Sequence, residues 1–137
     1  MPNLLTLTAW LALLTTPIFA QAPPACDGNI AVIRVSEIKP GGTINGFMAA
    51  VAAHKAWYRA NGITDNEIYA TRILVPDEKT KAPTYSDKQI MTFHINPPGP
   101  SRTTKRGDAA WNAYVKMYQD NSEIKSEVMT CLPKASK

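Results

Sequence analysis

Two spacings of apolar residues alternate along the chain and predict a mixed α+β fold. Residues 29–39 are rich in Val and Ile and end at a Pro-Gly-Gly breaker, as a strand does. A helix is expected next, because apolar side chains recur with helical spacing as far as a closing Asn61-Gly62. Thr43 or Asn45 is its expected N-cap. The inward positions of this helix are Phe47, Val51, His54 and Tyr58.

Three more strands and a second helix complete the pattern. The strands are expected over residues 67–75, 89–96 and 127–132, where Ile, Val, Met and Phe dominate. The polar stretch 76–87 contains proline and is expected to be a surface loop. Asp108 is the expected N-cap of the second helix. The inward positions of that helix are Trp111, Tyr114, Val115 and Tyr118.

The order βαββαβ predicts a ferredoxin-like fold. Its four-stranded antiparallel sheet has the spatial order 4-1-3-2, with both helices on one face. We expect the helices to cover the face that carries Ile33, Val35 and Phe93. The opposite face carries Arg34 and His94 among apolar residues, and such a half-apolar face favours pairing with a second copy of the chain.

The first 22 residues have the features of a signal peptide. Residues 4–19 are uncharged, and this stretch is shorter than the roughly 20 residues that span a membrane. It ends at Ala20-Gln21-Ala22, a small-x-small cleavage pattern. We therefore expect cleavage near Ala20 or Ala22 and a secreted or periplasmic product, with residues 23–137 as one domain. An uncleaved N-terminal membrane anchor is the alternative.

Composition narrows the function classes. The 137 residues carry 15 Lys+Arg against 11 Asp+Glu, without dense basic runs, so a nucleic-acid partner is not expected. The two cysteines and two scattered histidines give no metal-site spacing. In a 4-1-3-2 sheet the start of the first strand lies beside the end of the last, which predicts a Cys26–Cys131 disulfide. Export would supply the oxidising compartment.

The chain resembles the dimeric α/β-barrel superfamily, most closely its NIPSNAP-like and antibiotic-biosynthesis-monooxygenase-like domains. Three consecutive stretches carry this likeness: a strand ending in KPGG, a helix GFMAAVAAHKAWYRANG and a strand EIYATRILV. The resemblance implies a homodimer with sheets packed face to face, and a ligand cleft in each subunit between sheet and helices. Members include cofactor-free oxygenases and haem-binding enzymes. The haem-degrading ones use a histidine on the second helix, where AAWNAYVKMYQD has none, so we expect no cofactor.

His54 is the candidate catalytic residue. Its helical position points it at the sheet, where a neutral imidazole acts as a general base or a ligand contact near neutral pH. Trp57, Tyr58 and the sheet residue Phe93 are the expected walls of the same cleft. The alternative is that His54 is a core histidine and that the aromatic residues only pack.

Arg34 and His94 are expected on neighbouring strands and form a candidate anion site, or else part of a hydrated interface. Arg102, Lys105 and Arg106 form a small basic cluster before the second helix, which attracts anions or simply aids solubility.

The sequence therefore favours an exported protein that binds a small apolar organic molecule, with cofactor-free oxygenase or isomerase-like chemistry as its enzymatic version. The alternative is a non-catalytic structural or interaction module, whose cleft is filled by its own Trp57, Tyr58 and Trp111.

Overall fold

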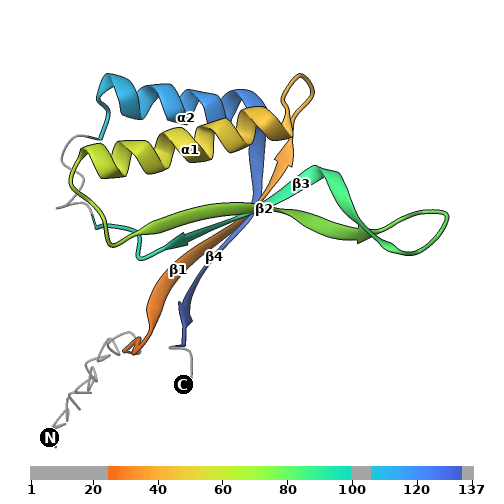
Figure 1. The fold of residues 1–137 in the computed structure, drawn as a ribbon, viewed down its shortest axis with the longest axis horizontal. Helices are drawn as coiled ribbons and strands as arrows, with labels where there is room; N and C mark the ends of the chain where they lie inside the picture. The colour runs from red at the N-terminus through yellow and green to blue at the C-terminus, as the bar shows by residue number, and fades with distance from the viewer. Residues whose placement is uncertain (1–24, 100–105, 134–137) are drawn as a thin grey trace, which may run out of the picture.

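The computed structural model describes residues 25–99 and 106–133 and shows a ferredoxin-like α+β fold. The sheet has the order β2-β3-β1-β4 with every neighbouring pair antiparallel, which confirms the predicted topology. Both helices lie side by side over one face of it (Figure 1). The proposed signal peptide and its cleavage site lie outside the described residues. The elements are β1 (Asn29–Ile38), α1 (Ile44–Ala60), β2 (Glu67–Pro76), β3 (Pro83–Ile95), α2 (Ala109–Asn121) and β4 (Ser122–Leu132).

Two strands are longer than the sequence predicts. β3 begins at Pro83 rather than Gln89, so the turn between β2 and β3 is confined to residues 77–82. β4 begins at Ser122 rather than Glu127. The added residues are mostly polar and mostly exposed, so they lack the apolar alternation that marks a strand and are held by backbone pairing. The lengthened β2–β3 hairpin projects beyond the helices (Figure 1).

The start of α1 is fixed to the end of α2. Thr43 is the N-cap, and its hydroxyl oxygen accepts from the backbone N–H of Gly46 at 2.9 Å. The backbone N–H of Thr43 donates to the side-chain oxygen of Asn121. The backbone N–H of Lys39 donates to the backbone carbonyl oxygen of Asn121. A Cβ on Gly42 would lie 2.3 Å from the same carbonyl oxygen, so the close approach requires glycine. The two helices are thereby held in one relative position.

The helices cover the face opposite to the expected one. Strand pairing places Arg34 beside Thr92, and His94 beside Ile68, on a face that packs beneath the helices. The prediction that Arg34 and His94 lie on the uncovered face is therefore wrong. The uncovered face, hereafter the outer face, is formed by Ile33, Val35, Tyr69, Met91, Phe93 and Val128.

The reversal has a physical reason. A pattern of apolar residues assigns the more apolar face of a sheet to the helices, because that arrangement makes the driest core. Here the space beneath the helices is in part an open cavity, and a cavity accommodates polar side chains such as Arg34, Ser36 and Thr92. The more apolar face is left on the outside, where Tyr69 stacks on Phe93 with ring centroids 5.0 Å apart.

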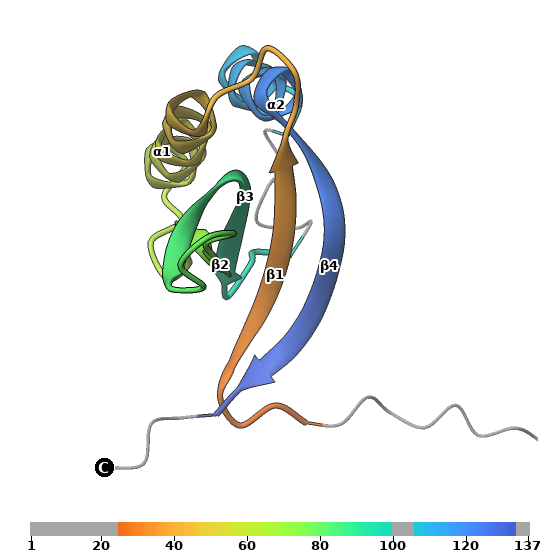
Figure 2. The same cartoon turned by 90° about the vertical axis from the view of Figure 1, so that its right-hand side faces the viewer.

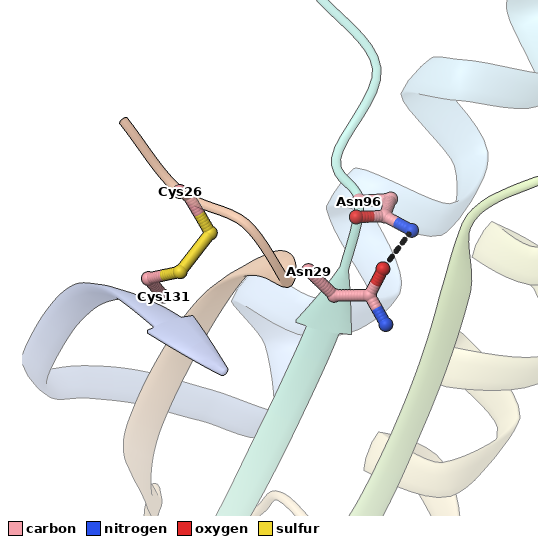
Figure 3. Close-up of a disulfide and its surroundings, with 4 residues drawn as sticks. All are labelled: Cys26, Asn29, Asn96 and Cys131. Atoms are coloured by element: carbon pink, nitrogen blue, oxygen red, sulfur yellow. Dashed lines mark hydrogen bonds between the residues drawn. A yellow bond between two sulfur atoms is a disulfide. The ribbon is translucent and has the colours of Figure 1, made fainter. Parts of the chain in front are cut away.

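A disulfide joins Cys26 to Cys131, as predicted from the strand order. The two Cα atoms are 5.7 Å apart, within the normal range for such a bond. Figure 3 shows it beside a hydrogen bond in which Asn96 donates to the side-chain oxygen of Asn29 at 3.1 Å. Disulfides persist in oxidising compartments, so the bond indicates an extracytoplasmic environment. Within the described ranges, no helix has the length and apolarity that a membrane crossing requires.

Candidate functional site

A cavity of about 600 Å³ lies between the sheet and the two helices. Figure 2 shows the layered arrangement, with α1 and α2 above the sheet and the pair β1 and β4 extending beyond them. Strands supply the floor, including Arg34, Thr92 and His94, and helices supply the roof, including His54. The aromatic walls are Phe47, Tyr58, Trp111, Tyr114 and Tyr118.

His54 lies between two tyrosine rings. Tyr58, one helical turn further along α1, stacks on it with centroids 4.8 Å apart and planes inclined by 30°. Tyr114 of α2 stacks on it at 4.3 Å and 14°. His94 of β3 approaches edge-on at 5.6 Å. The Nε2 atom of His54 and the hydroxyl of Tyr114 are buried and have no hydrogen-bond partner among the described residues.

Burial keeps both histidines neutral. It lowers the pKa of His54 from the ordinary 6.5 to about 3, and the positive charge of Arg34 and Arg106 and the neighbouring His94 act in the same direction. The pKa of His94 falls to about 4, through burial first and then through Arg34 and Arg106. Near neutral pH each ring therefore offers one N–H donor and one acceptor nitrogen.

His94 is held by a polar chain that begins on α1. Arg59 donates from Nη1 to the side-chain oxygen of Asn66 at 2.7 Å and from Nη2 to its carbonyl oxygen at 2.6 Å. The Nδ2 atom of Asn66 lies 3.4 Å from Nε2 of His94. Asn66, at the α1–β2 connection, is 1% exposed, so its amide must be paired within the protein.

The charge of the cavity is positive. Arg34 and Arg106 are the charged residues among its described lining, which includes no Asp or Glu. Nε of Arg34 donates to Glu127 at 2.5 Å, and the guanidinium of Arg106 lies 5.2 Å from the centre of the Trp111 ring. Burial raises the pKa of Tyr58, so its phenol stays protonated and offers a hydrogen bond. The described lining is therefore rich in donors and suited to a ligand with acceptor atoms.

The structure brings together four of the predicted site residues and separates two. His54, Tyr58, Arg34 and His94 all line the cavity. Trp57 does not belong to this lining: its indole N–H donates to Asp108 at 3.1 Å, the residue that caps α2. Phe93 lies on the outer face, on the other side of the sheet from His54.

Several residues of the cavity have a role that the sequence does not predict. Tyr114 and Tyr118, predicted only as inward positions of the second helix, pack in the core and also form a wall of the cavity. Arg106, predicted as part of a small basic cluster that attracts anions or aids solubility, borders the cavity, while Arg102 and Lys105 lie outside the described residues. Asn66 gave no signal, because a short polar stretch between a helix and a strand looks like any loop.

The fold and the cavity define the class of this chain: a ferredoxin-like α+β protein with a positively charged, aromatic-walled cavity between sheet and helices. Neither a protein-family model nor a curated protein matches it. Among solved structures, the crystal structure of SnoaB, a cofactor-independent oxygenase from Streptomyces nogalater, is similar in fold. The similarity covers 79% of this chain and 96% of SnoaB, at 7% sequence identity and a TM-score of 0.49.

Proposed function

We propose that this protein is exported and binds a small organic molecule in the cavity beneath its helices. The observation that carries the proposal is the open cavity beside His54. Its volume of about 600 Å³ lies within the range of roughly 300–1,000 Å³ typical of ligand sites. A purely structural module would fill this space with its own side chains. Of the three residues expected to fill it, Trp57 is turned to Asp108, and Tyr58 and Trp111 line the cavity without closing it.

The shape of the lining favours a flat ligand. Besides Tyr58 and Tyr114, which stack on His54, the rings of Phe47, Trp111 and Tyr118 line the cavity. A planar apolar molecule would gain stacking contacts here, each worth about 0.5–1.5 kcal/mol beyond simple burial.

One specific observation favours catalysis in this cavity in addition to ligand binding. Nε2 of His54 is buried and unpaired among the described residues, and a neutral imidazole there can accept a proton from a bound acidic molecule. Proton removal is the opening step of cofactor-free oxygenation and of isomerisation. The pKa of about 3, however, makes His54 a weak base in the empty cavity, so reversible binding is the primary proposal.

We also propose that the protein forms a homodimer through the outer face. Its side chains form a continuous patch across all four strands, and Tyr69 and Val128 are 47% and 54% exposed. An apolar patch of this kind is seldom left in water. A two-fold axis lets one patch cover an identical one, which is the commonest way in which proteins bury such a face.

Export is part of the same proposal. The Cys26–Cys131 disulfide supports it, since it requires an oxidising compartment. Residues 1–22 would then serve as the cleaved signal peptide.

Small molecules that co-purify with the natively exported protein provide the test. We expect mass spectrometry to find an organic molecule in the wild type and to lose it in Thr92→Phe, which places a ring in the cavity floor. Thr84→Phe is the matched control, because Thr84 is an exposed strand residue of the projecting hairpin. The proposal fails if the wild type carries nothing above a blank and binds no member of a library of flat organic fragments.

A further inference from the structure

We propose that the ligand of this cavity is a flat carboxylate whose oxygens accept hydrogen bonds from His94 and Arg34. This inference rests on the proposed function, because it specifies the chemical class of the molecule bound there. Its first support is the orientation of one amide. Arg59 carries only donors, so the atom of Asn66 that faces it at 2.7 Å must be the oxygen. The NH₂ group of Asn66 therefore faces His94.

The orientation of Asn66 fixes the tautomer of His94. An amide NH₂ only donates, so Nε2 of His94, 3.4 Å away, must accept. A neutral imidazole that accepts through one nitrogen carries its proton on the other. His94 therefore holds its proton on Nδ1 and borders the cavity as a hydrogen-bond donor. Asn66 is a positioning residue in this scheme, since it acts through His94.

Arg34 adds charge beside that donor. It pairs with Thr92 across β1 and β3, and His94 lies two residues along from Thr92 on the same face of the sheet. Neighbours of this kind lie within reach of one ligand group. Glu127 engages only the Nε atom of Arg34 in the described contacts, and a guanidinium has further N–H groups in a planar fork that matches a carboxylate.

The remainder of the described lining makes an anion preferable to a neutral acceptor. Arg106 contributes a second positive charge, and the described lining itself holds no Asp or Glu; Glu127 pairs with the Nε atom of Arg34 from outside that lining. Aromatic walls remove part of the water around a bound molecule, and a carboxylate there needs the charged partners that the two arginines supply. A neutral molecule of the same shape as the carboxylate would offer the N–H groups of Arg34 and His94 a weaker acceptor.

Matched probes separate this inference from the proposed function. Calorimetric titration near pH 7 of the disulfide-bonded protein would compare 2-naphthoate with 2-naphthamide, which share shape and differ in charge. We expect the carboxylate to bind about tenfold more tightly or better. Equal affinities would overturn the inference and leave the proposed function standing. Binding of neither probe, nor of any other flat carboxylate, would overturn the inference. The proposed function would fall with it only if the wild type also carries nothing above a blank and binds no flat organic fragment.

Two arginine variants test whether Arg34 is the source of the preference for the carboxylate probe. Arg34→Gln is expected to reduce the preference for naphthoate to within about threefold. The control is Arg72→Gln, because Arg72 pairs with Asp87 away from the cavity and its loss should leave the preference intact. If the preference for naphthoate survives in Arg34→Gln, the proposed contact with Arg34 is wrong. The same conclusion follows if Arg72→Gln removes the preference equally.

The tautomer is tested without any ligand. Long-range ¹H–¹⁵N spectra of the wild type near pH 7 should show His94 protonated on Nδ1, and a proton on Nε2 would refute the argument from Asn66. In Asn66→Asp the new carboxylate accepts, so the proton should move to Nε2 and the preference for naphthoate should fall. If that variant does not fold, the wild-type spectrum and Arg34→Gln still decide.

Discussion

The imidazole of His54 and the phenol ring of Tyr114 lie face to face, with centroids 4.3 Å apart and planes inclined by 14°. One ring comes from α1 and the other from α2, so the contact between the helices is also a wall of the cavity. A change at this contact affects helix packing and ligand binding together, and the two effects must be measured separately.

The variant His54→Gln separates the effect on helix packing from the effect on ligand binding. Glutamine preserves a polar group of similar size but cannot stack between Tyr58 and Tyr114. We expect a stability loss of about 1–2 kcal/mol from the lost ring contacts, together with loss of most of the co-purifying molecule. Thermal unfolding and mass spectrometry measure the two quantities, with the exposed neighbour Lys55→Gln as the control. A lower melting temperature with unchanged ligand content would assign His54 to the core.

The two histidines should make the protein sensitive to acid. Their pKa values in the folded chain, about 3 and about 4, lie below the ordinary 6.5. The unfolded chain therefore takes up protons first as the pH falls, and stability is lost from about pH 6.5 down to about pH 4 for His94 and about pH 3 for His54. For His94 alone the loss is of the order of 3 kcal/mol. Urea unfolding at several pH values checks this, and a slope unchanged in His94→Gln would refute it.

Strand order and the disulfide could be predicted because both follow from local signals and a topological rule. A Pro-Gly-Gly breaker, an Asn-Gly helix end and the Asp108 cap divide the chain, and the βαββαβ order then fixes which strands are neighbours. Cys26 and Cys131 fall at adjacent strand ends as a consequence.

The site itself could be predicted only in part. Helical spacing alone aims His54 and Tyr58 inward, so these were found. The side of the sheet on which Arg34 and His94 lie depends on which of two partly apolar faces the helices cover, and alternation along a strand does not decide between them. Asn66 acts through contacts with Arg59 and His94, 7 and 28 residues away, and single-residue patterns do not show such contacts.

The outer face should control the oligomeric state. We expect light scattering at micromolar concentration to report a dimer for the wild type and a monomer for Phe93→Glu, because a charge would be buried at the centre of the patch. Met48→Lys is the control: Met48 is an exposed apolar residue of α1, away from the outer face. A wild-type monomer with native circular dichroism would contradict the proposed interface.

The disulfide should contribute much of the stability. It closes a loop with a sequence separation of 105 residues, for which the chain-entropy treatment gives about 4–5 kcal/mol. Replacement of Cys26 and Cys131 by serine should lower the free energy of unfolding in urea by a similar amount. Thiol counting on the denatured, unreduced wild type is the companion measurement, and two reactive thiols would refute the bond.

The same bond has a mechanical consequence. It joins a residue just before β1 to the penultimate residue of β4, so nearly all of the six secondary-structure elements lie within one closed loop of chain. Tension applied to the chain beyond Cys26 and Cys131 passes through the sulfur–sulfur bond and bypasses the sheet, the helices and the cavity. Tethered by its ends, the domain would keep its cavity intact under load, and reduction would abolish this shielding at once.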